Sequence, residues 1–259
     1  MGHQLLGSMP ASRKWVAVVT ALTDNASAEA VASLSADAAE QAFTRARTSP
    51  DLIAAVELLA QLPQAARGPD YLKDLRELGF RLDAAPSLLE LSTALLDALD
   101  RRSGAPSGSP SDMGVIARLA AAECLTALVA PQLPTLFGAS PDDVRTAVGR
   151  LSSGSGFAVL AREFFSRLIY RTLDYYLSRA LGAHQGPGQR FAGMSDRRQF
   201  EVMLETHCQE ATRIIADYAG GWYGKHVYQQ SGLTDTAIRS FVAYSITKIR
   251  AELRARRDA

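Results

Sequence analysis

Residues whose side chains could do chemistry are concentrated near the end of the sequence. A helical pattern from residue 200 carries His207, Cys208 and Glu210. It is followed by Gly220-Gly221-Trp222-Tyr223-Gly224-Lys225-His226 and then by a second, arginine-rich helical pattern. Comparable side chains are sparse elsewhere in the 259 residues. The C-terminal third is therefore where we expect a functional surface.

The histidines and cysteines of this stretch lack the spacing of a metal site. His207 and Cys208 are adjacent on a helix, so their side chains point about 100° apart and cannot easily share one ion. The Glu-x-x-His pair of di-iron bundles and the His-Glu-x-x-His motif of zinc enzymes are both absent. We predict no metal and no cofactor.

Groups suited to covalent or acid-base catalysis do not form a known motif. Serine never occurs as Gly-x-Ser-x-Gly. Glu201, Glu205 and Asp217 are spread along a helix whose solvated face would carry such residues anyway. Cys124 and Cys208 lie in apolar helical patterns, which is typical of small buried thiols. We leave catalytic residues unassigned and lean against an enzyme.

The aromatic residues after the double glycine are stronger candidates for a binding site. Gly220 and Gly221 are expected to end a helix, which would place the following residues in a surface connection. The rings could plug the end of a bundle, or they could bind a partner. The candidate binding residues in this segment are Trp222, Tyr223, Lys225, His226 and Tyr228.

Arginines form a stripe on the last helical pattern. At 100° per residue, Arg250 and Arg254 lie within about 60° of Arg239, beside the apolar face. The stripe could bind an anion or an acidic partner, although arginines near a helix C-terminus also favour solubility and the helix dipole. We include Arg239, Arg250 and Arg254 in the candidate binding surface.

An interhelical pocket is a further hypothesis. Polar side chains inside a helical bundle usually specify such pockets. The candidate pocket residues are His207, Arg171 and Tyr175. A lone histidine in an amphipathic helix is more often structural, so this hypothesis ranks below a binding surface.

Apolar residues recur at helical spacing through nearly the whole sequence, and alternating strand-like runs are almost absent. We therefore predict an all-α, multi-helix bundle. The longest apolar stripe runs from Phe157 to Leu181 and predicts the central buried helix. Ser-Pro-Asp at 49–51 and 140–142 predicts two helix starts, and Thr234 and Ser195 predict the starts of the last two helices.

A weak internal similarity divides the chain. Gln-Leu-Pro at 61–63 recurs 71 residues later at 132–134. The two copies would belong to repeated three-helix units at 50–102 and 112–182, followed by a long C-terminal helix pair, with coincidence as the alternative. The predicted regions are an N-terminal helical region at 1–102, a flexible Ser/Gly/Pro linker at 103–111 and a C-terminal helical region at 112–259.

Composition narrows the class of protein. A hydrophobic content of 47% with 21% charged residues is typical of globular chains. The net charge of +1 gives no overall attraction to nucleic acid or anionic lipid. The apolar run from Trp15 to Leu22 is too short for a signal peptide or a membrane span, so we expect a cytoplasmic protein. Abundant arginine and alanine suggest a bacterial source.

These features favour a non-enzymatic helical module, an adaptor that docks a protein partner through its C-terminal aromatic and arginine residues. One alternative is a single-stranded nucleic-acid binder that stacks bases on Trp222, Tyr223 and Tyr228. Another is a small-ligand sensor or enzyme that uses the interhelical pocket. Docking of a second copy of the chain is a further alternative.

Overall fold

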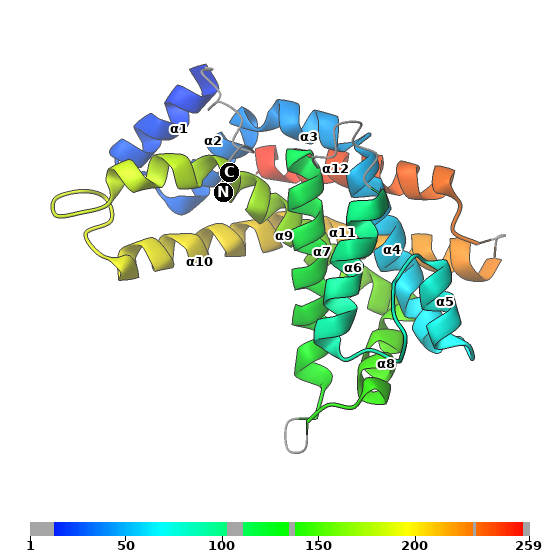
Figure 1. Ribbon diagram of the computed structural model, residues 1–259. Coiled ribbons are helices and arrows are strands. Elements are labelled where there is room, and N and C mark those ends of the chain that lie inside the picture. The colour runs from blue at the N-terminus through cyan, green and yellow to red at the C-terminus, as the bar shows by residue number, and fades with distance from the viewer. Residues whose placement is uncertain (1–12, 103–110, 135–137, 230–231, 256–259) are drawn as a thin grey trace.

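The computed structural model describes residues 13–102, 111–134, 138–229 and 232–255, and within them the chain is helical without a strand (Figure 1). An isolated bridge pairs Gln185 with Phe191. The prediction of an all-α, multi-helix bundle is confirmed. The α-helices are α1 (Arg13–Thr23), α2 (Ala28–Ala38), α3 (Glu40–Ala46), α4 (Pro50–Arg67), α5 (Tyr71–Glu77), α6 (Leu88–Arg102), α7 (Asp112–Val129), α8 (Pro141–Gly149), α9 (Gly154–Leu181), α10 (Met194–Ala211), α11 (Arg213–Gly224) and α12 (Asp235–Ala255). The shorter helices are η1 (Ala130–Gln132), η2 (Arg150–Ser152), η3 (Gly182–His184) and η4 (Lys225–Gln229).

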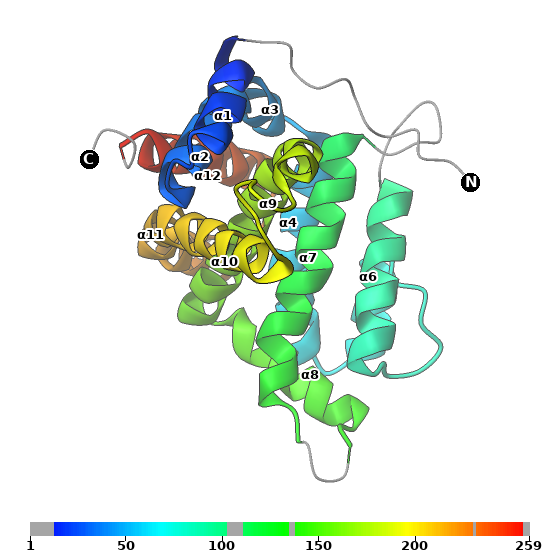
Figure 2. The same cartoon turned by 90° about the vertical axis from the view of Figure 1, so that its left-hand side faces the viewer.

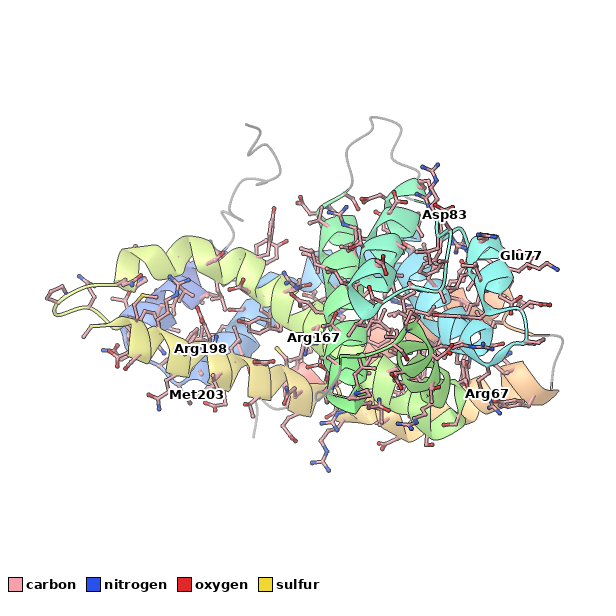
Figure 3. All side chains as sticks on the ribbon, turned by 60° about the horizontal axis from the view of Figure 1, so that its bottom comes forward. Arg67, Glu77, Asp83, Arg167, Arg198 and Met203 are labelled. Atoms are coloured by element: carbon pink, nitrogen blue, oxygen red, sulfur yellow. The ribbon has the colours of Figure 1, made fainter. Side chains whose placement is uncertain are left out.

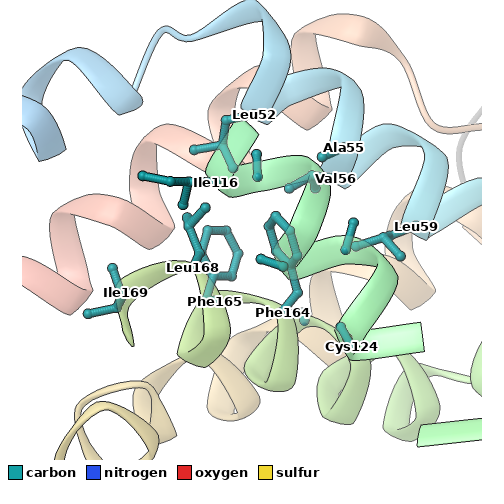
Figure 4. Close-up of a cluster of buried hydrophobic side chains, with 14 of the residues drawn as sticks. Leu52, Ala55, Val56, Leu59, Ile116, Cys124, Phe164, Phe165, Leu168 and Ile169 are labelled. Carbon is teal, nitrogen blue, oxygen red and sulfur yellow. The ribbon is translucent and has the colours of Figure 1, made fainter. Parts of the chain in front are cut away.

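The 28-residue helix α9 is the centre of the fold, as its apolar stripe predicts. It contacts α7, α10 and α11. Phe164, Phe165 and Leu168 of α9 are buried and lie toward α4, where they meet Leu52 and Val56 (Figure 4). Burying such side chains contributes about 1.5–3 kcal/mol each, and Phe165 also packs on Phe241 of α12, so this cluster stabilises the contact of α9 with several helices.

Helix starts follow the predicted caps in most cases. The Ser49 hydroxyl accepts the backbone N–H of Leu52 at the start of α4, and Ser140 forms a capping box at the start of α8. Thr234 accepts the N–H of Ala237 at 3.2 Å, which caps α12 as expected. The start of α10 differs, because Gly193 is its cap and Ser195 lies inside the helix.

The second half of α9 and the first half of α10 extend together as an arm, and α1 and α2 lie along it (Figures 1 and 2). Arg190, in the connection between α9 and α10, donates to the carbonyls of Ala21 and Leu22 at 3.2 and 3.3 Å. It thereby satisfies the C-terminal end of α1. Arg198 and Met203 lie on α10 in this arm, at the opposite end of the molecule from Arg67 (Figure 3).

Helices from before and after residues 103–110 share one hydrophobic core. Helix α4 contacts α7 and α8, and α2 contacts α10 and α12. Residues 103–110, which make up most of the predicted linker, lie outside the described residues. The helix order after residue 49 is long, short, long in both halves, but Pro63 lies inside α4 whereas Pro134 follows η1. The repeat therefore stays a prediction.

Within the described residues, one segment is long and apolar enough to cross a membrane by length and composition. It spans Asp112–Gln132, comprises α7 and η1 and contains an 18-residue window with a mean hydropathy of 1.7. A core helix of a folded bundle has the same properties, and α7 lies against α4, α6 and α9. We therefore describe α7 as a core helix of this fold.

Candidate functional site

The double glycine does not end a helix, contrary to the sequence prediction. Helix α11 runs through both glycines to Gly224, and the break instead comes at Thr212, between α10 and α11. At Gly220 a Cβ atom would lie 2.8 Å from the carbonyl oxygen of Gly154 at the start of α9. The absence of a side chain therefore permits close packing of two helices, which sequence spacing alone does not reveal.

Tyr223 belongs to the core, which corrects its placement in a surface connection. Its side chain is fully buried, and its ring stacks on Phe157 with centroids 4.3 Å apart. The hydroxyl donates to the carbonyl oxygen of Ala60 in α4 at 3.0 Å. Burial raises the pKa of Tyr223 above its ordinary value, so the phenol stays neutral.

Trp222 is half-buried at the seam between α11 and α12. Its ring stacks on Phe241 of α12, with centroids 4.3 Å apart and an interplanar angle of 25°. The imidazole ring of His226, four residues later in the chain, also contacts the indole, with ring centroids 5.1 Å apart. The indole is thus anchored by the core and still reaches solvent.

Tyr218 and Tyr244 continue this row of rings. Tyr218 lies one turn before Trp222 on α11 and is half-buried, whereas Tyr244 on α12 is 48% exposed. Their rings meet edge to face with centroids 4.8 Å apart. The Tyr218 hydroxyl lies 2.7 Å from the hydroxyl of Ser245, which fixes its orientation. We call the row formed by Tyr218, Trp222, Phe241 and Tyr244 the aromatic seam.

Lysines lie at both ends of the aromatic seam. The Lys248 ammonium is 5.4 Å from the centroid of the Tyr244 ring, one turn beyond it on α12. Lys225 is exposed and follows Trp222 by three residues, in the π-helical segment η4. Among the described residues neither ammonium forms an ion pair with a carboxylate.

Tyr228 also lies in η4 and is 62% exposed, although its hydroxyl donates to the carbonyl oxygen of Ser152 at 3.1 Å. A π-helical turn is rare and often marks a functional position. His226 is half-buried beside Trp222. The predicted surface residues of this segment therefore divide into a core residue, Tyr223, and a group at or near the surface.

The arginine stripe of α12 is engaged in ion pairs inside the molecule. Arg250 and Arg254 both contact the carboxylate of Glu40 in α3, which also accepts from Lys14 at 2.7 Å. Arg239 pairs with Asp235 one turn earlier at 2.7 Å. The contacts of Glu40 join α12 to α1 and α3, whereas the Arg239 pair lies within α12. Each arginine of the stripe therefore already contacts a carboxylate of this protein.

The hydrogen bond from Lys14 and the charges of Lys14, Arg254 and Arg250 together lower the pKa of Glu40 to about 2, against an opposing effect of desolvation. The carboxyl is therefore ionised throughout the physiological range. Beside it, Ser33, Phe43 and Leu253 line a small cavity together with the ion-paired groups. This cluster is a structural clamp between the N-terminal helices and α12.

The candidate pocket residues lie on two neighbouring helices, α9 and α10. Arg171 on α9 donates to Glu123 of α7, with one contact at 2.8 Å, and Tyr175 donates to Asp112 of α7 at 3.1 Å. His207 is buried on α10. Two of the three residues thus join α9 to α7, and no described cavity has all three in its lining.

Two buried thiols and one partly buried acid have raised pKa values. Burial raises the pKa of both Cys124 and Cys208, which keeps the thiols protonated. Burial, followed by the charge of Glu201, raises the pKa of Asp174 on α9. Across the described residues, no group of three or more histidine, cysteine, aspartate or glutamate side chains could hold a metal ion.

No known protein family, curated protein or solved structure matches this chain.

Three of the four residues of the aromatic seam were not predicted from the sequence. Tyr218, Phe241, Tyr244 and Lys248 were not among the candidates, although their spacing carries a signal. Tyr218 and Trp222 are four residues apart on one helical face, and Phe241, Tyr244 and Lys248 are three and four residues apart on another. What the sequence could not reveal is that the two faces meet.

Proposed function

We propose that this protein is a non-enzymatic interaction module that docks a protein partner on the aromatic seam of α11 and α12. The observation that carries the proposal is a continuous row of rings in which Tyr244 is 48% exposed and Tyr218 and Trp222 are partly exposed. Tyrosine and tryptophan are the residues in which interfaces concentrate binding energy. Tyrosine and tryptophan combine an apolar ring with a polar group, which is why they are enriched at interfaces.

The rigidity of the aromatic seam supports the same proposal. Trp222 is held by Phe241, and Tyr218 is held by Ser245, so both rings are ordered before a partner arrives. A preorganised surface loses little side-chain entropy on binding, typically about 0.5–1.5 kcal/mol less per side chain that is already immobilised. The long helices α9 and α4 beneath the seam form a stiff support.

A differential co-purification tests this proposal. The wild-type protein and two variants, Tyr244→Ser and the matched control Leu89→Ser, are recovered from extract of the source cell. Leu89 is 77% exposed and lies on α6, so its substitution changes surface apolarity away from the aromatic seam. Protein and nucleic acid are quantified together in each sample, after circular dichroism shows that all three chains keep their helicity.

We expect a protein that co-purifies with the wild type and with Leu89→Ser and is reduced at least about fivefold with Tyr244→Ser, which corresponds to about 1 kcal/mol of lost binding energy. Equal recovery from all three chains would contradict docking on the aromatic seam. Nucleic acid that is lost only with Tyr244→Ser, and whose binding weakens steeply with salt, would replace the protein partner by a nucleic-acid partner.

A further inference from the structure

The charges around the aromatic seam indicate what kind of partner it accepts, and this inference rests on the proposed function. We infer that the seam binds an acidic amphipathic segment of a different protein, whose apolar side chains cover the rings and whose carboxylates meet Lys225 and Lys248.

The two helices run antiparallel at the seam, because Tyr218 meets Tyr244 whereas Trp222, one turn later on α11, meets Phe241, one turn earlier on α12. Lys225 therefore lies beyond the Trp222 end of the row, and Lys248 lies beyond the Tyr244 end. The exposed rings stand between two cations. A bound segment that covers the rings would bring its own ends close to both ammonium groups.

Both lysines are available for an intermolecular contact. Most arginines of the surrounding helices already contact acids, as Arg239 contacts Asp235 and Arg213 contacts Glu210 at 3.3 Å. In contrast, neither lysine has an ion pair within the described residues. The Lys248 ammonium lies over the Tyr244 ring, an interaction worth about 0.5–1 kcal/mol when exposed.

The nearby acids do not cancel this pattern. Asp217 is exposed, but it lies about 100° around α11 from Tyr218, on the outer side of the helix. Glu252 lies one turn beyond Lys248, outside the section between the two lysines. The rings themselves therefore lie in a section bounded by positive charge at each end.

This arrangement disfavours a second copy of the chain as the occupant. In a two-fold dimer built on one face, each end of the aromatic seam meets either the same end or the opposite end of its partner. Because both ends carry a lysine, like charges would face each other in either case. Like-charge contacts at an interface disfavour that partner, whereas an acidic segment turns the same lysines into attractive contacts.

The ring faces favour a protein segment over single-stranded nucleic acid. One face of the Trp222 indole is covered by Phe241, and Lys248 lies over the Tyr244 ring. Stacking of successive bases needs open aromatic faces, which these contacts reduce. Aliphatic and aromatic side chains of a bound helix can instead pack against the edges of the rings between α11 and α12.

A peptide selection tests the inference directly. The probe is a displayed library of amphipathic helical peptides, about 16 residues long, with an apolar stripe and random residues on either side. Wild-type protein selects the binders, and Tyr244→Ser protein removes those that do not need the aromatic seam. Peptides that survive both steps are synthesised, and their affinity is measured for wild type, for Lys225→Glu/Lys248→Glu and for Lys225→Arg/Lys248→Arg.

We expect aspartate and glutamate to be enriched beside the stripe, a loss of affinity of at least about tenfold with the glutamate variant and a change within about twofold with the arginine variant. Neither lysine has an ion pair in the described structure, so we expect both variants to fold, which circular dichroism checks. Survivors that are neutral or basic, or acidic survivors that bind the glutamate variant as well as wild type, would overturn the acidic-partner inference alone. A selection that yields no Tyr244-dependent peptide would overturn the docking face and the inference with it.

Discussion

At the residue scale, Glu40 carries the densest set of charge contacts in the described structure. Its carboxylate forms ion pairs with Lys14 of α1 and with Arg250 and Arg254 of α12. We predict that Glu40→Gln lowers the free energy of unfolding at pH 7 by about 1–2 kcal/mol, a value reduced from the full pKa shift because the side chain is 31% exposed and screened. The control Glu77→Gln, whose pair with Lys73 is 3.8 Å long and mostly exposed, should change it by less than about 0.5 kcal/mol.

The pH dependence of this effect has a definite sign. The folded-state pKa of Glu40 is lowered to about 2, below the value of about 4.3 in an unfolded chain. Its stabilisation is therefore complete above about pH 5 and is lost as the pH falls through 4 toward 2. Urea denaturation of wild type and Glu40→Gln at several pH values measures this, and a stability difference that stayed constant down to pH 2.5 would contradict it.

Tyr223 provides a second test at this scale, because the sequence places it in a binding surface and the structure places it in the core. We predict that Tyr223→Phe costs about 1 kcal/mol of stability through loss of the hydrogen bond to Ala60. Partner or peptide binding at the aromatic seam should not change, since the ring keeps its stack on Phe157. Denaturation and a binding titration of the same variant separate the two effects, and reduced binding by a stable variant would return Tyr223 to the interface.

At the scale of elements, the adjacent glycines Gly220 and Gly221 of α11 have opposite roles. We predict that Gly220→Ala destabilises the protein by about 1–3 kcal/mol, because a methyl group would lie 2.8 Å from the Gly154 carbonyl. Gly221→Ala meets nothing within 4 Å and should stabilise by about 0.5–1 kcal/mol through helix propensity. Thermal unfolding of the two variants side by side checks this. Stabilisation by both substitutions would mean that α9 and α11 do not approach as closely as described.

The same glycines show how far element prediction could go from sequence. The apolar period fixed α9, and side-chain caps fixed the starts of α4, α8 and α12, because both signals are local. From the sequence, the double glycine predicts the end of a helix, because glycine is common just after the last helical residue. Its role here depends on Gly154, distant in sequence, and no local pattern indicates that contact.

At the scale of the whole molecule, helices from both predicted regions contribute to one core. We predict that residues 13–102 and 111–255 unfold together rather than as separate units. Trp15 lies on α1 and Trp222 on α11, so Trp15→Phe and Trp222→Phe each leave one fluorescent reporter in a different part of the fold. In each variant the tryptophan signal and the helical circular dichroism should change at the same urea concentration. A tryptophan transition that clearly preceded loss of helicity would instead indicate two independently stable regions.

The sequence predicts the region of the chain that contains the candidate site, but not which side chains form it. The C-terminal third, Trp222 and Lys225 follow from residue type and position, since aromatic and basic residues gather there. The aromatic seam itself depends on the antiparallel contact of α11 with α12, which brings Tyr244 beside Tyr218. Tyr223 belongs to the core because α11 also packs on α9 and α4. Likewise, the ion pairs of Arg250 and Arg254 depend on α3, which is distant in sequence.

The most direct measurement is site-specific photo-crosslinking in the source cell. A photoreactive phenylalanine analogue replaces Tyr244 in one variant and Leu89 in a second variant, since both positions are exposed and lie on different helices. We expect a discrete protein adduct at position 244 that is absent at position 89 and that weakens when Lys225 and Lys248 are both changed to glutamate. The same adducts at both positions, or none at position 244, would contradict docking on the aromatic seam.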